Sequence, residues 1–213
     1  MAQYLFDFDG TLVDSMPTYV SVMLRVLDEN GVGYRDDIIK TITPLGYKGT
    51  AEYYQRLGVP LSVEEMVETM NRYAEEAYKH FIMDKEGVRE TLVALKKNFS
   101  LNILTASPHR LLDPCLKRLG LWEFFDNIWS CDDFNTSKAD PQIYKLVAER
   151  LEMDVHDIVF VDDNIDAVKI AKSAGVTCYG IYDKSSHDLV DQMKEASDRY
   201  LMTFKSLLDV TSP

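Results

Sequence analysis

Short apolar stretches rich in β-branched and aromatic residues recur along the chain, and amphipathic stretches with helical spacing separate them. The predicted strands are Tyr4–Phe8, Leu101–Thr105, Asn127–Cys131, Ile158–Asp162 and Cys178–Tyr182. The predicted helices between them are Val88–Lys97, Leu111–Leu119, Pro141–Leu151 and Ala167–Ala174, the last followed by Gly175 at a common helix-ending position. Strands that alternate with helices are typical of a parallel sheet covered on both faces. The pattern therefore predicts an α/β fold with a Rossmann-like doubly wound parallel sheet.

The segment from about Met16 to Met83 differs from the rest of the chain because its spacing is helical throughout. Glycine and proline residues divide it into several predicted helices, and it contains no credible strand. We therefore expect a core domain made of residues 1–14 and 84–213 and an inserted helical domain at 15–83. After the last predicted strand, the pattern indicates a helix over His187–Glu195, a short run at Tyr200–Met202 and a final helical turn.

Composition and charge narrow the possible partners. Apolar residues make up 46% of the 213 residues and charged residues 27%, as in an ordinary globular protein. No apolar run approaches the length of a membrane span and no secretory leader pattern is present, so we expect a cytoplasmic protein without a membrane partner. The three cysteines are widely spaced and predict buried thiols. The net charge of −12 disfavours nucleic acid, so we expect a small-molecule substrate and a monomer or weak homodimer.

Two carboxylates stand at the end of the first predicted strand, where Asp7 and Asp9 precede Gly10. Residues i and i+2 of a strand share a face, so both side chains are expected to project together from the strand end. Two like charges this close favour a bound divalent cation, a shared proton or a turn that separates them. An Asp-Gly turn with solvated carboxylates is the simpler alternative.

Other polar residues follow the later predicted strands. They are Thr105, Ala106 and Ser107 after the second strand, Lys138 after the third, and Asp162, Asp163 and Asp166 after the fourth. Each has an ordinary explanation, as a helix cap, a helix start or a solvated lysine. In an open parallel sheet, however, the carboxyl ends of the strands meet at one edge, where ligands bind. Carboxylates, hydroxyls and an amine there suit phosphoryl transfer, and oxygen ligands without His or Cys favour Mg²⁺.

With these residues in this order, the sequence resembles the haloacid dehalogenase superfamily, in the helical-cap subgroup that includes phosphoglycolate phosphatases and β-phosphoglucomutases. The motifs that carry the resemblance are Asp7–Ser15, Leu104–Ser107, Lys138 with Asp140–Pro141, and Val161–Asp166. The first motif is specific, and the other three gain weight from their order and spacing. Two positions depart from the family pattern, because Ala139 stands where relatives usually have proline and Val161 where they usually have glycine. Neither departure removes a reacting group.

The resemblance implies the chemistry of the first motif. Asp7 would be the nucleophile that forms an aspartyl phosphate, and Asp9 would protonate the leaving alcohol and then activate water. The dehalogenase members resemble this chain in fold but lack the second aspartate. Phosphoryl chemistry is therefore favoured over carbon–halogen cleavage.

The remaining motif residues would hold the metal and the phosphoryl group. The implied Mg²⁺ ligands are Asp7, the Asp9 backbone carbonyl and Asp162, with Asp163 or Asp166 in support. The implied phosphoryl contacts are Thr105, the Ala106 N–H, Ser107 and Lys138, of which the lysine would also neutralise the nucleophile.

The inserted helical domain resembles a mobile cap, with hinges near Leu12–Met16 and Ile82–Gly87, and would decide the substrate. Within it, Tyr47 and Lys48 lie between two glycines and are candidates to contact the non-reacting part of the substrate, although they could equally be an exposed helix start. The sequence thus predicts a Mg²⁺-dependent phosphatase of a small phosphate monoester, such as phosphoglycolate or a sugar phosphate. A phosphoglucomutase-like phosphotransferase and a non-catalytic binding or regulatory protein of the same fold are the alternatives.

Overall fold

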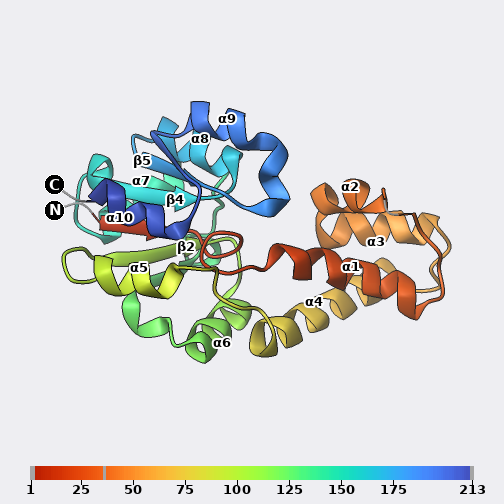
Figure 1. Ribbon diagram of the computed structural model, residues 1–213. Coiled ribbons are helices and arrows are strands. Elements are labelled where there is room, and N and C mark those ends of the chain that lie inside the picture. The colour runs from red at the N-terminus through yellow and green to blue at the C-terminus, as the bar shows by residue number, and fades with distance from the viewer. Residues whose placement is uncertain (1–2, 36, 212–213) are drawn as a thin grey trace. The chain divides into compact units, whose positions relative to one another are not determined.

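The computed structural model describes residues 3–35 and 37–211 of the chain. The described chain divides into two compact units. One consists of the chain up to Asp14 and from Met83 onward, and it holds every described strand (Figure 1). The other is Ser15–Ile82, whose described residues form helices and their connections.

Six strands form a single parallel sheet in the described part of the first unit. They are β1 (Gln3–Phe6), β2 (Leu101–Thr105), β3 (Asn127–Ser130), β4 (Ile158–Asp162), β5 (Thr177–Ile181) and β6 (Arg199–Leu201). Their order in the sheet is β3-β2-β1-β4-β5-β6, with every neighbouring pair parallel. This is the strand order of a doubly wound sheet. The predicted α/β, Rossmann-like fold is confirmed.

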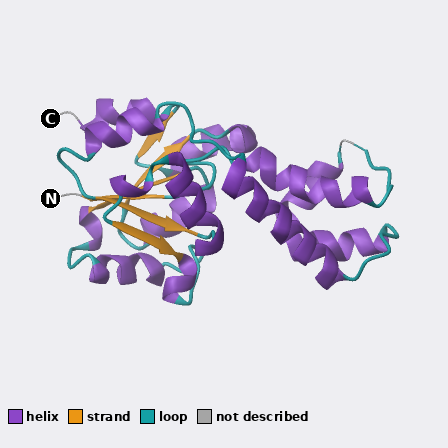
Figure 2. Ribbon diagram, turned by 90° about the horizontal axis from the view of Figure 1, so that it is seen from below, coloured by secondary structure: helices purple, strands orange, loops and turns teal. Residues whose placement is uncertain are grey.

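Helices connect the strands and lie on both sides of the sheet, as Figure 2 shows. The helices are α5 (Val88–Leu95), α6 (His109–Leu119), α7 (Gln142–Arg150), α8 (Ile165–Ser173), α9 (Val190–Ala196) and α10 (Leu207–Thr211). Short 3-10 turns are η2 (Trp122–Phe124), η3 (Cys131–Phe134), η4 (Val155–Asp157), η5 (Lys184–Leu189) and η6 (Phe204–Ser206).

Two sequence-based boundaries differ from the structure, and one short run without an assigned structure proves to be a strand. The first strand ends at Phe6 instead of Phe8, because the chain turns early and the amides of residues 12 and 13 both donate to the Phe8 carbonyl. The run predicted at Tyr200–Met202 is a sixth strand, β6, which pairs with β5. The helix predicted over His187–Glu195 is divided between η5 and α9, because the backbone leaves helical geometry at Leu189, where φ is −103° and ψ is 5°.

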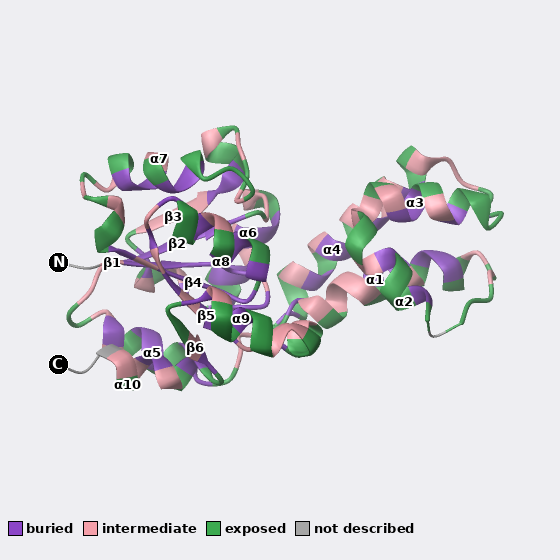
Figure 3. Ribbon diagram, turned by 90° about the horizontal axis from the view of Figure 1, so that it is seen from above, coloured by how far each residue is buried: buried purple, intermediate pink, exposed green. Residues whose placement is uncertain are grey.

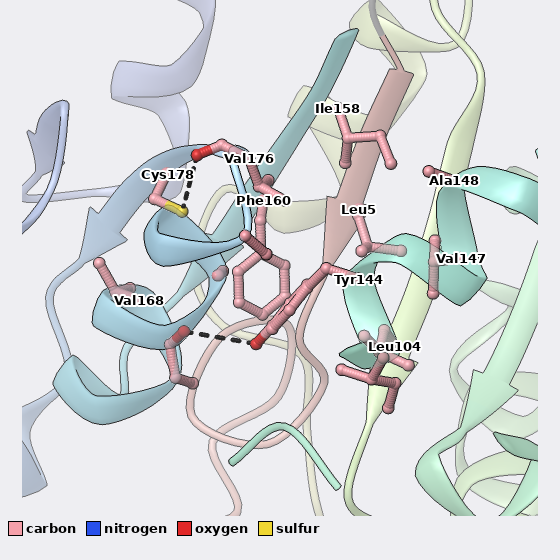
Figure 4. Close-up of a cluster of buried hydrophobic side chains, with 14 of the residues drawn as sticks. Leu5, Leu104, Tyr144, Val147, Ala148, Ile158, Phe160, Val168, Val176 and Cys178 are labelled. Atoms are coloured by element: carbon pink, nitrogen blue, oxygen red, sulfur yellow. Dashed lines mark hydrogen bonds between the residues drawn. The ribbon is translucent and has the colours of Figure 1, made fainter. Parts of the chain in front are cut away.

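Side chains of β1 alternate between two apolar layers. Figure 4 shows Leu5 in the cluster that α7 and α8 build with one face of the sheet, in which Tyr144 is fully buried. Phe6 packs instead against the rings of Phe125 and Phe204, whose centroids lie 6.3 and 5.6 Å away. Figure 3 shows the central strands buried and the covering helices carrying both buried and exposed residues. Burial of both faces fixes the sheet in register, and with it the residues at its carboxyl edge.

The second unit has a core of its own. Its helices are α1 (Met16–Glu29), α2 (Ile38–Ile42), α3 (Gly46–Arg56) and α4 (Val63–His80), with the 3-10 turn η1 (Thr43–Leu45). Tyr54 is fully buried, and its hydroxyl donates to the Met23 carbonyl at 3.1 Å. A capping box of Ser62 and Glu65 begins α4. Among the described residues, no helix combines the length and apolar character needed to cross a membrane.

Candidate active site

The carboxyl ends of β1, β2 and β4 bring three of the predicted site residues to one edge of the sheet. Asp7 follows β1 directly, and its amide donates to the Val161 carbonyl of β4 at 2.9 Å. Thr105 and Asp162 are the last residues of β2 and β4. The Asp7, Thr105 and Asp162 side chains are buried because helices cover both faces of the sheet up to this edge.

Three of the carboxylates form a cluster. Oxygen atoms of Asp7, Asp162 and Asp163 all lie within 4.8 Å of one another, and each residue is less than a tenth exposed. The Lys138 ammonium donates to Asp7 Oδ1 at 2.5 Å and to Asp162 Oδ2 at 2.7 Å. Among the described residues, Lys138, in the loop after β3, is the only lysine with a hydrogen bond to this cluster.

Burial and like charge shift the pKa values in this cluster. Burial raises the pKa of Asp7 well above its usual value, Lys138 opposes the rise, and Asp162 adds to it. Burial raises the pKa of Asp163 to about 7, with further contributions from the charges of Asp162 and Asp183. Burial by itself lowers the pKa of the Lys138 ammonium, but the two carboxylates that it contacts raise it more. Lys138 therefore stays protonated at neutral pH.

The donor set fits a hard divalent cation. Three carboxylates face one ammonium, which leaves two negative charges when all are ionised, the charge that Mg²⁺ would balance. All the nearby donors are oxygen atoms, which Mg²⁺ prefers over nitrogen or sulfur. A cation would also offset the burial and the like charges that raise the pKa values of Asp7 and Asp163.

The two candidate supporting carboxylates lie in different surroundings. Asp163 belongs to the cluster and accepts a hydrogen bond from the Thr11 hydroxyl at 3.1 Å. Asp166 is exposed, lies in the first turn of α8 and is outside the cluster. The cause is local, because the Asn164 side chain caps α8 and accepts hydrogen bonds from the amides of Asp166 and Ala167. The helix therefore begins immediately after the cluster and carries Asp166 away from it.

Asp9 has a partner different from that of Asp7. Its Oδ2 accepts a hydrogen bond of 2.5 Å from the Ser107 hydroxyl. The two aspartates do not project from the strand itself, because β1 ends at Phe6 and Gly10, at φ +77°, turns the chain. Asp9 still lies close enough for its charge to add to the rise in the Asp7 pKa. Thr105 Oγ1 accepts from the Ser107 amide at 3.0 Å, while Ala106 is exposed beside it. The loop after β2 is thereby folded against the turn after β1.

A histidine contacts two carboxylates close to the loop after β2. His109 lies at the start of α6, with Nδ1 at 2.7 Å from Asp113 and Nε2 at 2.9 Å from Asp133 of η3. Burial lowers the His109 pKa, but the two carboxylates raise it more, and the net shift is upward. The imidazole thus links the loop that carries Ser107 to the turn that precedes Lys138.

The two candidate substrate residues of the helical unit lie in the first turn of α3. The Tyr47 ring stacks on Tyr19 of α1 at 5.3 Å between centroids and packs against the core of that unit. Lys48 is exposed. Their proposed contact with substrate stays a prediction.

Sequence reasoning gave no role to Thr11, Lys85 or Asp183. Thr11 is fully buried, accepts from the Asp163 amide at 3.2 Å and donates back to its carboxylate. Lys85 forms an ion pair of 2.9 Å with the buried Asp183. Thr11 could have been noticed within the first motif, but no local pattern marks the other two, since their contacts join distant parts of the chain.

Comparison with known proteins identifies the family. The haloacid dehalogenase-like hydrolase family matches residues 4–181, most of the chain, so the chain belongs to this family. The predicted resemblance is therefore confirmed, and so is the expectation of an enzyme of the phosphoric monoester hydrolase type.

Individual relatives agree with this assignment. A phosphorylated carbohydrates phosphatase of Thermotoga maritima is 31% identical over 184 residues, covering 85% of each chain. The pyrophosphatase PpaX of Bacillus velezensis is 31% identical over 180 residues, covering 83% of this chain and 81% of the relative. The crystal structure of a putative β-phosphoglucomutase from Thermotoga maritima has a TM-score of 0.85 at 28% identity, covering 99% of this chain and 98% of the other.

Proposed function

We propose that this protein is a Mg²⁺-dependent phosphatase that hydrolyses a small phosphate monoester through an aspartyl phosphate on Asp7. The observation that carries the proposal is the buried cluster of Asp7, Asp162 and Asp163 in contact with Lys138. A nucleophilic carboxylate held beside an ammonium and further oxygen ligands is the arrangement that phosphoryl transfer needs.

The reaction proceeds in two successive displacements at phosphorus. Asp7 Oδ attacks the phosphorus, a bond forms between them, and the bond to the leaving oxygen breaks while Asp9 donates a proton to that oxygen. Asp9 then takes a proton from water, whose oxygen attacks the phosphorus and releases Asp7 as a carboxylate. The Ser107 hydroxyl holds Asp9 in place for both transfers. Lys138 neutralises Asp7 and the phosphoryl oxygens.

Mg²⁺ would be held by the carboxylates of Asp7, Asp162 and Asp163, together with the Asp9 backbone carbonyl. When bound, it supplies positive charge that offsets the repulsion between the phosphoryl oxygens and the attacking carboxylate. Thr105 and the backbone N–H of Ala106 are the proposed contacts of a phosphoryl oxygen, since Thr105 ends the buried strand β2 and the exposed residue Ala106 follows it directly.

A phosphorylated sugar or a similarly small monoester is the proposed substrate, supported by the named activity of the Thermotoga relative. Tyr47 and Lys48 of α3 are the proposed contacts of its non-reacting part. K48A should alter the ratio of kcat/KM values across a panel of sugar phosphates and phosphoglycolate. Equal ratios in K48A and wild type would remove Lys48 from substrate selection.

The test is release of inorganic phosphate from para-nitrophenyl phosphate and from a panel of phosphorylated metabolites, with Mg²⁺ and with EDTA. The wild type should need Mg²⁺, and D7N should lose activity by about 10³-fold or more. D166N is the matched control, because Asp166 is an exposed aspartate outside the cluster. Equal activity in D7N and wild type would refute the mechanism.

A phosphoglucomutase-like phosphotransferase is the second candidate, favoured by the 28% identity to the putative β-phosphoglucomutase. It would use the same Asp7 and Asp9 but return the phosphoryl group to a sugar hydroxyl instead of water. Conversion of a sugar 1-phosphate to its 6-phosphate without free phosphate would favour this candidate over the phosphatase.

A further inference from the structure

Lys85 holds together three segments that are far apart in the sequence. Its ammonium donates to the Gly10 carbonyl at 2.6 Å, the Tyr182 carbonyl at 2.9 Å and Asp183 Oδ2 at 2.9 Å. A lysine ammonium has three hydrogens, so each has an acceptor. The side chain is 20% exposed, and that of Asp183 is 4% exposed. This is a partly buried, fully satisfied cation and not a surface ion pair.

The counter-ion is itself fixed. Asp183 Oδ1 accepts from both the amide and the hydroxyl of Ser185, at 2.8 and 2.5 Å. Burial raises the Asp183 pKa, but the hydrogen bonds from Ser185 and Lys85 lower it more, so the carboxylate is ionised at neutral pH. The Lys85 ammonium is therefore paired with a carboxylate that other hydrogen bonds hold in place after β5.

On the other side, Lys85 contacts the turn that carries Asp9. Gly10 follows Asp9, and its Cα faces Asp163, because a Cβ there would lie 2.5 Å from Asp163 Oδ2. The Lys85 amide also donates to the Leu12 carbonyl at 3.0 Å. The turn is thus enclosed between Lys85 and a member of the carboxylate cluster.

We propose that Lys85 is a positioning residue, which fixes the Asp9–Gly10 turn so that Asp9 meets the substrate in the correct orientation. The proposal rests on the proposed function, because it assumes that Asp9 transfers protons. Lys85 acts through the turn, since its three hydrogens are already taken by acceptors within the protein. A displacement of about 1 Å at a reacting group can cost about 10²-fold in rate.

Replacing Lys85 by methionine keeps the length of the side chain and removes all three hydrogen bonds. In K85M, kcat should fall about 10- to 100-fold while KM changes less than about threefold, because the positioning of Asp9 is lost and substrate binding is not. K172M is the matched control, since Lys172 also pairs with an aspartate, Asp198, at 2.7 Å in the same unit but far along the chain. K172M should keep the wild-type kcat.

Chemical rescue separates positioning from folding. K85C should be as slow as K85M, and aminoethylation with 2-bromoethylamine should restore most of kcat, because it rebuilds an ammonium of nearly lysine length. The native thiols Cys115, Cys131 and Cys178 are buried, which protects them from the reagent. A K85C protein that folds but regains no activity on aminoethylation would overturn the proposal.

A second measurement does not depend on activity. The amides of Gly10, Leu12 and Val13 donate within the turn, to the Val13 and Phe8 carbonyls. Their hydrogen exchange, followed by NMR, should be at least about tenfold faster in K85M than in wild type and K172M, while β4 amides exchange unchanged. Unchanged exchange in the turn would overturn the positioning role. A wild type that releases no phosphate would refute the proposed function, and the exchange comparison would still decide the role of Lys85.

Discussion

Replacing Asp163 by asparagine should stabilise the metal-free protein at neutral pH and weaken its affinity for Mg²⁺. Asparagine has nearly the same size and keeps an oxygen that can accept from Thr11, as the carboxylate does at 3.1 Å. It removes one of the three negative charges of the cluster. The residue would therefore contribute to function at a cost in stability, as is common in active sites.

The expected change in the free energy of unfolding follows from the pKa of Asp163, which burial and the charges of Asp162 and Asp183 raise from 3.8 to about 7. Between these two values the folded protein keeps a proton that the unfolded chain has released. The free energy of unfolding therefore decreases as pH rises through this range. At about 1.4 kcal/mol per pKa unit, the loss above pH 7 is about 4 kcal/mol. The asparagine of D163N cannot ionise, so this variant should lack the contribution of residue 163, while the contribution of Asp7 remains in both proteins.

The assay is urea unfolding in EDTA at pH 5 and pH 8, followed by tryptophan fluorescence. Both tryptophans, Trp122 and Trp129, belong to the unit that contains Asp163, so the signal reports on that unit. The gap in unfolding free energy between D163N and wild type should widen by about 2–3 kcal/mol from pH 5 to pH 8. Mg²⁺ at about 100 times its Kd should stabilise the wild type by about 2.7 kcal/mol, and D163N by clearly less.

D166N is the control, because Asp166 lies in the same segment but is exposed and outside the cluster. D166N should have the same unfolding free energy as the wild type at both pH values, and Mg²⁺ should stabilise it as much as it stabilises the wild type. Equal unfolding free energies of D163N and wild type at both pH values would refute the assignment of a raised pKa to Asp163. A gap that widens with pH in D166N instead of D163N would refute it as well.

Three further predictions concern the same edge of the sheet. Both G10A and G120A place an alanine at positive φ, which should lower the free energy of unfolding by about 1–2 kcal/mol. Only at Gly10 would the new Cβ collide with a carboxylate, that of Asp163. Only G10A should therefore also lose Mg²⁺ affinity in calorimetric titrations. K138M should lower kcat about 10²- to 10³-fold in steady-state assays, and a loss below about threefold would contradict its contact with the nucleophile. In an NMR titration His109 should show a pKa above 6.5, because its carboxylate neighbours outweigh burial, and D113N should lower that pKa; an unchanged midpoint would exclude the ion pair.

The sequence was sufficient to predict the sheet and the chemistry at its edge. Apolar runs separated by helical periods specify parallel strands, and parallel strands gather their carboxyl ends at one edge. The sequence therefore predicts Asp7, Thr105 and Asp162 close together, and they do follow or end neighbouring strands. The error at the end of β1 had a local cause, since apolar character continues to Phe8 although the backbone has already turned.

The choice between Asp163 and Asp166 was beyond the sequence. Both follow β4 within a few residues, and both are compatible with a helix start or a metal ligand. The structure separates them, because Asp163 lies in the carboxylate cluster, whereas Asp166 is exposed in the first turn of α8, which the Asn164 side chain caps. Residue type and spacing do not determine this difference.

What the sequence by itself determined is the fold class, the hydrolase family and the kinds of groups available for the chemistry. What only the tertiary structure decided is which of those groups touch: Lys138 on Asp7, Ser107 on Asp9, and Lys85 on Gly10. The physical reason is that secondary structure follows from local periodicity, whereas these contacts join segments separated by scores of residues. Strand order, register and the caps of the intervening helices bring such segments together, and they become fixed only when the whole core packs.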